Sequence, residues 1–127
     1  MEPKSYETGL KVRTEVLGEA HVQRSLNDVD DFNRELQQIV TGFAWGEIWS
    51  RPGLSRRERS ILNLGMLTAL NRPHEFQTHV RGALNNGVSR EEIREILLQT
   101  AVYCGFPAAI DAVRNARAVF KELDAKR

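Results

Sequence analysis

The chain contains a single cysteine, Cys104, among its 127 residues. One thiol forms neither an intramolecular disulfide nor a Cys-x-x-Cys pair, so thiol exchange within the chain is excluded. An excess of charge of one sign is missing too, because 18 basic and 17 acidic residues leave a net charge of +1. This balance gives no electrostatic footprint for nucleic acid, and we expect no nucleic-acid partner.

Long apolar runs are also absent. No segment approaches the roughly 18 apolar residues of a membrane span, and the first residues lack the apolar core of a secretory signal. We therefore expect no membrane partner and a cytoplasmic location. The length predicts one domain over residues 1–127, with a core large enough to fold without disulfides or metal.

The alternation of β-branched and polar residues that marks strands is missing throughout. Apolar residues instead recur at steps of three and four, which is the period of a helix. The sequence predicts an all-α fold of about six helices, near residues 5–17, 31–49, 55–71, 73–86, 89–104 and 107–123. The polar stretch 19–31 is expected to connect the first two and to supply caps. Pro73 and a capping box of Ser89 and Glu92 are expected to start helices, and Gly87 and Gly105 are expected to follow helix ends.

Two of the expected helices have unusual apolar faces. In 31–49 one stripe starts at Phe32, and Trp45 points to the opposite side, so the end of this helix is buried, lines a pocket or meets another subunit. Gly46 would let another segment approach its backbone closely. The helix 55–71 is apolar nearly all round, which predicts a central buried helix.

The helix 73–86 carries proton-handling groups. Glu75 and His79 are four residues apart and share one side of the helix, with His74 beside them. A carboxylate next to an imidazole suits general acid–base work, so these three residues are catalytic candidates. The alternative for His79 is a core histidine bound to a backbone carbonyl.

Glu58 is a fourth catalytic candidate, and it stands three residues after Ser55. This spacing also predicts a capping box, so Glu58 can be a helix cap, a pocket carboxylate or both. The chain has no His-Glu-x-x-His motif and no cysteine set, and we expect no metal. It also lacks a glycine-rich phosphate loop and a Gly-x-Ser-x-Gly elbow.

Several segments, taken in order, resemble the carboxymuconolactone decarboxylase family: residues 43–54, 79–87, 91–95 and 101–109. The resemblance covers about 43–120. It implies an alkylhydroperoxidase D-like helical fold and a cyclic homo-oligomer, a hexamer or trimer. It also implies decarboxylation of γ-carboxymuconolactone, a lactone dicarboxylate, to β-ketoadipate enol-lactone in protocatechuate catabolism, without a cofactor.

The peroxidase branch of that superfamily has two cysteines and a histidine on the corresponding helix. His79 matches the histidine, whereas Arg72 and Glu75 stand at the cysteine positions. The departure removes thiol redox chemistry and leaves imidazole and carboxylate. Glu58 is similar to an upstream glutamate of that branch, although its interval to His79 differs.

The clustering and the resemblance together suggest the substrate-binding residues. Arg51 or Arg81 would hold a substrate carboxylate, and Trp45 and Trp49 would wall the pocket. Two other functions stay open. One is a related decarboxylase acting on another lactone or acid, and the other is a non-catalytic helical oligomeric module, which the two-sided apolar segment 43–49 would serve equally well.

Overall fold

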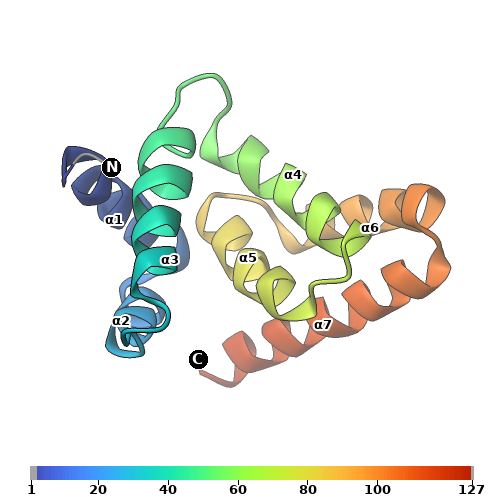
Figure 1. Cartoon of the computed structure of the whole chain (residues 1–127). Coiled ribbons are helices and arrows are strands. Elements are labelled where there is room, and N and C mark those ends of the chain that lie inside the picture. Colours follow the sequence, from blue (N-terminus) through green and yellow to red (C-terminus); the bar gives the residue numbers. More distant parts are fainter. Residues whose placement is uncertain (1–2, 127) are drawn as a thin grey trace. The chain divides into compact units, whose positions relative to one another are not determined.

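A computed structural model describes residues 3–126, and within that range the chain is helical and contains no strand (Figure 1). The all-α fold class is therefore confirmed. The elements of the described range are α1 (Pro3–Leu17), α2 (Glu19–Asn27), α3 (Arg34–Ile39), the π-helix η1 (Val40–Ile48), α4 (Arg56–Ala69), α5 (Pro73–Asn85), α6 (Arg90–Cys104) and α7 (Phe106–Ala125). None of the helices in residues 3–126 is long and apolar enough to cross a membrane.

The chain divides into two compact units, at residue 56. In unit 1, Gly18 follows α1 with a φ of 93°, a left-handed conformation that glycine adopts without strain. The chain then forms α2, where a polar connection was expected. Val22 is the buried side chain of α2, and the half-buried Leu26 packs against the same core of unit 1. So small an apolar signal explains why periodicity did not predict this helix.

The helix expected over 31–49 begins later and changes its winding. Asp30 Oδ1 accepts hydrogen bonds from the backbone N–H groups of Phe32 (2.9 Å) and Asn33 (3.1 Å), which fixes the entry to α3. Asp30 thus holds the turn before α3, whereas the N-cap residue of α3 is Asn33, which makes no side-chain cap hydrogen bond. From Val40 the winding is that of a π-helix, and the Trp49 N–H donates to the Ala44 carbonyl at 2.9 Å. Such i→i−5 winding is rare and occurs frequently at functional sites.

Two glycines allow α1 and η1 to pack backbone against backbone. A Cβ added to Gly9 would lie 1.8 Å from the Thr41 carbonyl oxygen, and one added to Gly46 would lie 2.1 Å from the Ser5 carbonyl oxygen. Both distances are far inside van der Waals contact. The prediction that Gly46 admits a close backbone approach is therefore confirmed, and α1 is the segment that approaches.

Unit 2 is built around α5, which lies between α4 and α7 (Figure 1). Phe76, Val80 and Ala83 of α5 are almost completely buried. They share one core with buried residues of the neighbouring elements, namely Leu64, Val88, Ile93, Leu97, Ala112, Ala116 and Val119. The apolar stripe formed by Phe76, Val80 and Ala83 is thus the centre of the unit.

The prediction that helix 55–71 is buried nearly all round is wrong for the described chain. Ser60, Leu64 and Thr68 of α4 are buried, but Leu62, Met66 and Leu70 are 52%, 45% and 61% exposed. The helix has an apolar row on each side, and only one of them meets the core. Hydrophobic periodicity reports which residues are apolar, and it does not report what covers them.

The expected helix ends in unit 2 are confirmed. Pro73 is the first residue of α5, and Gly87 after it has a φ of 89°. Ser89 and Glu92 form a complete capping box at the start of α6, and the Glu92 carboxylate also pairs with Arg57 of α4. Gly105, with a φ of 98°, separates α6 from α7.

Candidate functional site

His79 lies on α5, the most deeply buried helix of unit 2. Its neighbours Thr78 and Val80 are buried, while the imidazole itself is half-buried. A side chain in this position is held by the core and still reaches solvent or a ligand. His79 therefore combines a fixed backbone with an accessible ring, as a proton-handling residue requires.

Asn63 of α4 contacts the ring of His79. The Asn63 Nδ2 atom lies 3.3 Å from His79 Nδ1, and Asn63 is also half-buried. The sequence reasoning missed this residue. A signal was present, because Asn63 is the polar residue within the apolar stretch 61–67 and stands three residues after Ser60 on the same face of α4. Its partner, however, lies on another helix and is not visible in local spacing.

The other candidates of unit 2 are more exposed. Glu75 and His74 stand in the first turn of α5, and both are exposed. Within residues 3–126 neither side chain makes a hydrogen bond or an ion pair. Glu58 is exposed in the first turn of α4, which begins directly after Ser55 as the predicted cap requires. The structure thus brings Asn63 to His79, and the roles of the three exposed residues stay predictions.

Arg81 already has a carboxylate partner. Its Nη2 atom donates to Glu122 Oε2 of α7 at 2.6 Å, and the side chains are 30% and 46% exposed. The hydrogen bond and charge of Arg81 lower the pKa of Glu122, with a smaller contribution from Lys126. A substrate carboxylate at Arg81 would therefore compete with Glu122.

The remaining three candidates belong to unit 1. The rings of Trp45 and Trp49 stack with centroids 4.6 Å apart and an interplanar angle of 26°. Trp45 is buried and Trp49 half-buried. The two residues are four apart at the end of η1, a spacing that places them on one side. Arg51 follows in an exposed turn. Trp45 and Trp49 therefore form a stacked pair within unit 1, and their role as the wall of a substrate pocket stays a prediction.

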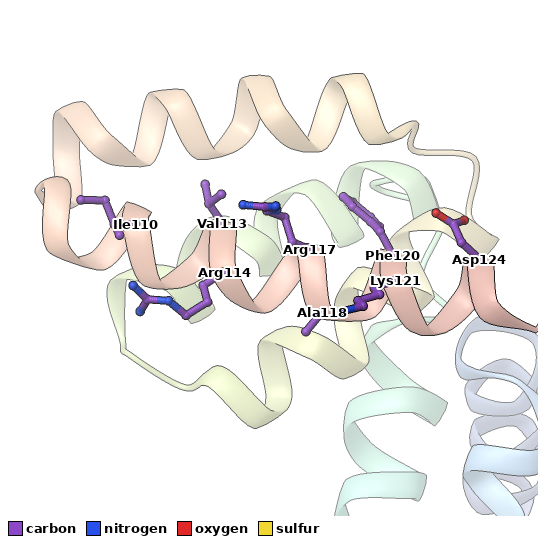
Figure 2. Close-up of a pocket in the computed structure, with 8 residues that line it drawn as sticks. All are labelled: Ile110, Val113, Arg114, Arg117, Ala118, Phe120, Lys121 and Asp124. Carbon is purple, nitrogen blue, oxygen red and sulfur yellow. The ribbon is translucent and has the colours of Figure 1, made fainter.

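A large surface hollow, of about 790 Å³, lies on α7 (Figure 2). The residues that line it all come from this helix: Ile110, Val113, Arg114, Arg117, Ala118, Phe120, Lys121 and Asp124. Arg90 contacts two of them. Its guanidinium carbon lies 4.6 Å from the centroid of the Phe120 ring, and its Nη2 atom lies 2.7 Å from Asp124 Oδ1 in an ion pair. None of the predicted site residues lines this hollow. Within residues 3–126 no three His, Cys, Asp or Glu side chains are placed to hold a metal ion.

Comparison with known proteins identifies close relatives. The chain is 49% identical over 118 residues to 4-carboxymuconolactone decarboxylase from Acinetobacter baylyi. The aligned residues make up 93% of this chain and 88% of that protein. It is 45% identical over 108 residues to nitrosuccinic acid decarboxylase from Metarhizium robertsii, covering 85% and 76% of the two chains.

The model of the Carboxymuconolactone decarboxylase family matches residues 34–118. This range begins with α3 and includes most of α7, so it contains elements of both compact units and all eight candidate site residues. The resemblance found in the sequence is thereby confirmed, and the chain belongs to the carboxymuconolactone decarboxylase family.

Proposed function

We propose that this chain decarboxylates γ-carboxymuconolactone to β-ketoadipate enol-lactone, a step of protocatechuate catabolism in the β-ketoadipate pathway. The observation that carries the proposal is the 49% identity to a 4-carboxymuconolactone decarboxylase along 93% of the chain. The half-buried imidazole of His79 supports it, because the reaction requires a hydrogen-bond or proton donor on a rigid element.

The substrate supplies its own electron sink. Its departing carboxylate is attached to the ring carbon γ to the lactone carbonyl. When the bond to CO2 breaks, the electron pair moves through the ring double bond to the carbonyl oxygen and forms a 2-oxyfuran-type enolate. Protonation of the α carbon then gives the enol-lactone. The reaction as proposed needs no cofactor, and the protein stabilises the developing oxyanion and controls the proton.

We assign His79 to the lactone oxygen or to the proton transfer. Glu75, Glu58 or His74 would supply or orient the second proton-handling group. All three are exposed, and apo geometry of this kind does not exclude a proton-handling role. In unit 1, the stacked pair of Trp45 and Trp49 stays the candidate for an apolar substrate-binding wall.

For the substrate's other carboxylate, Arg51 and Arg81 are the candidates. Arg81 must exchange its bond to Glu122 for a bond to the substrate, whereas Arg51 stands in an exposed turn. Guanidinium groups bind carboxylates through two parallel hydrogen bonds, which orients the ligand as well as holding it. Replacement of each arginine by lysine would raise KM at the residue that binds the substrate.

A second substrate is favoured by a specific observation, the 45% identity to a nitrosuccinic acid decarboxylase. Nitrosuccinate is also a dicarboxylate with an electron sink beside a carboxylate, because a nitro group can take up the electron pair. The same donor that stabilises a lactone enolate would stabilise the resulting nitronate. Decarboxylation of such a related acid is therefore the runner-up.

The first experiment is a spectrophotometric assay with purified protein treated with chelator. γ-Carboxymuconolactone is generated in situ from 3-carboxymuconate with its cycloisomerase, and nitrosuccinate is tested in parallel. Turnover of the lactone with the higher kcat/KM supports the proposal. Turnover of nitrosuccinate alone would replace it with the runner-up. A folded sample that acts on neither would favour a non-catalytic helical module.

Self-association is part of the proposal. Unit 2 exposes six large apolar side chains on the end of α6 and the start of α7, here named the α6–α7 patch. They are Leu98, Val102, Tyr103, Phe106, Ile110 and Val113, which are 42% to 82% exposed. Exposed apolar side chains in such number are typical of subunit interfaces. We propose a homo-oligomer, a hexamer or trimer, in the cytoplasm, which light scattering and cell fractionation would test.

A further inference from the structure

We infer that Asn63 is a positioning residue for His79. Its side-chain amide fixes the imidazole in the tautomer with the proton on Nε2, so that Nε2–H is the atom presented to the substrate. This inference deepens the proposed function and rests on it, because it names the atom of His79 that acts on the lactone. The contact itself joins two half-buried side chains of unit 2.

The direction of the hydrogen bond follows from the atoms involved. Asn63 Nδ2 lies 3.3 Å from His79 Nδ1. In this orientation the Asn63 amide nitrogen can only donate, and the tautomer that accepts this hydrogen bond carries no proton on Nδ1. A neutral imidazole has one N–H, which is then on Nε2. The nitrogen that faces away from Asn63 is therefore the donor.

The backbone around this contact is held firmly. Ser60, one turn before Asn63, and Leu64, the residue after it, have no exposed surface. Ser60 Oγ accepts a 2.9 Å hydrogen bond from Asn86 Nδ2, directly after α5. The register of α4 against α5 is thus fixed by a second polar contact. Asn63 and His79 consequently meet as two side chains on rigid helices, as orienting groups need.

The tautomer selects a role for His79. An imidazolium would carry a proton on Nδ1 as well, and that proton would face the donating amide of Asn63. The observed orientation therefore favours the neutral ring. A neutral Nε2–H is a hydrogen-bond donor for the lactone oxygen as negative charge develops there. The proton for the α carbon then comes from another group.

Nitrogen NMR of the substrate-free protein tests the tautomer directly. Long-range ¹H–¹⁵N correlation distinguishes the protonated nitrogen of an imidazole, and the signals of His79 are assigned by their loss in His79→Gln. At a pH where the ring is neutral, we expect the Nε2–H tautomer in the wild type. In Asn63→Asp, a variant of nearly equal shape, the carboxylate accepts from Nδ1 and the tautomer should reverse. A wild-type ring with its proton on Nδ1 would overturn the inference.

Kinetics with γ-carboxymuconolactone provide the second readout. Asn63→Leu removes one hydrogen bond, and we expect kcat to fall roughly 2- to 12-fold with KM unchanged. Asn63→Asp withdraws the proton from Nε2 and should lower kcat by about tenfold or more. The matched control is Gln77→Leu, which removes the 2.9 Å bond from α5 to Asn115 and does not touch His79. It should keep the wild-type kcat and tautomer.

The two readouts separate the two possible failures. A wild-type protein that does not turn over the lactone overturns the proposed function, and the NMR spectra then decide the tautomer without substrate. A wild-type protein that is active, with both Asn63 variants folded and equally active, overturns the positioning role even where the tautomer is as expected. Circular dichroism of each variant verifies folding.

Discussion

Arg81 Nη2 and Glu122 Oε2 lie 2.6 Å apart and connect α5 to α7. The contact lowers the pKa of Glu122 from its ordinary value of 4.5, because the charged carboxylate gains a hydrogen bond and an opposite charge. Both side chains retain partial exposure, so solvent screens the pair and its effect on stability is small.

The pKa shift predicts a pH-dependent stability difference. A carboxyl group whose pKa is lower in the folded state stabilises the fold above its unfolded pKa, and this contribution disappears as the pH falls through the folded pKa. Glu122→Gln should therefore lower Tm slightly at pH 7 and have no effect well below pH 4.5. Thermal melts of both proteins over this range measure it. A difference that persists undiminished in acid would contradict the assignment.

His79→Gln removes the group that we assign to the reaction. We expect kcat to fall by roughly 10²–10⁴, the usual loss when an oxyanion donor or a proton-transfer group is removed. His21→Gln is the control, since His21 lies on α2 in unit 1 and has no assigned role. Steady-state assays with the lactone decide the question. A folded His79→Gln protein with wild-type kcat would remove His79 from the mechanism.

The parts of the fold that the sequence predicted well are those fixed by local chemistry. Pro73 starts α5 because it has no N–H to satisfy, and Gly87 ends it because the turn requires a positive φ. The Ser89–Glu92 box likewise depends only on atoms three residues apart. Such signals act within one turn and are readable without knowledge of the tertiary structure.

The parts that the sequence did not predict depend on partners far along the chain. The contact of Asn63 was not predicted because its partner His79 lies 16 residues later, on another helix. Gly46 indicated a close backbone approach, but neither the identity of the approaching helix α1 nor the π-winding of η1 is encoded in the local periodicity. Leu62 begins an exposed apolar row of α4, which the sequence predicted to be buried. Exposed and buried apolar residues follow the same helical spacing, so the sequence alone does not distinguish them.

Gly46 offers a direct test of the backbone contact in unit 1. Gly46→Ala places a methyl group 2.1 Å from the Ser5 carbonyl oxygen, so α1 and η1 must separate. We expect a loss of about 1–3 kcal/mol in the free energy of unfolding, the usual range for overpacking. Urea denaturation measures this quantity.

Gly65→Ala is the matched control for the same substitution. Gly65 lies inside α4, and a Cβ there would meet no atom within 4 Å. Because alanine is a better helix former than glycine, the variant should gain up to about 1 kcal/mol. If Gly46→Ala were as stable as the wild type, the contact of α1 with η1 would be looser than described.

The α6–α7 patch predicts the effect of a charge on assembly. Val102 and Phe106 are 76% and 72% exposed, so within a single chain their apolar side chains contribute little buried surface to stability. If a second copy covers them, Val102→Glu or Phe106→Glu places an unpaired carboxylate in an apolar contact, which is strongly unfavourable. Each variant should shift the molar mass measured by light scattering from that of an oligomer towards 14.4 kDa, the mass of one chain.

The control is Gln23→Glu, which adds the same charge to an exposed position of α2 and should leave the mass unchanged. A wild-type protein that is already a single chain at micromolar concentration would contradict self-association, and the patch would then need a different partner.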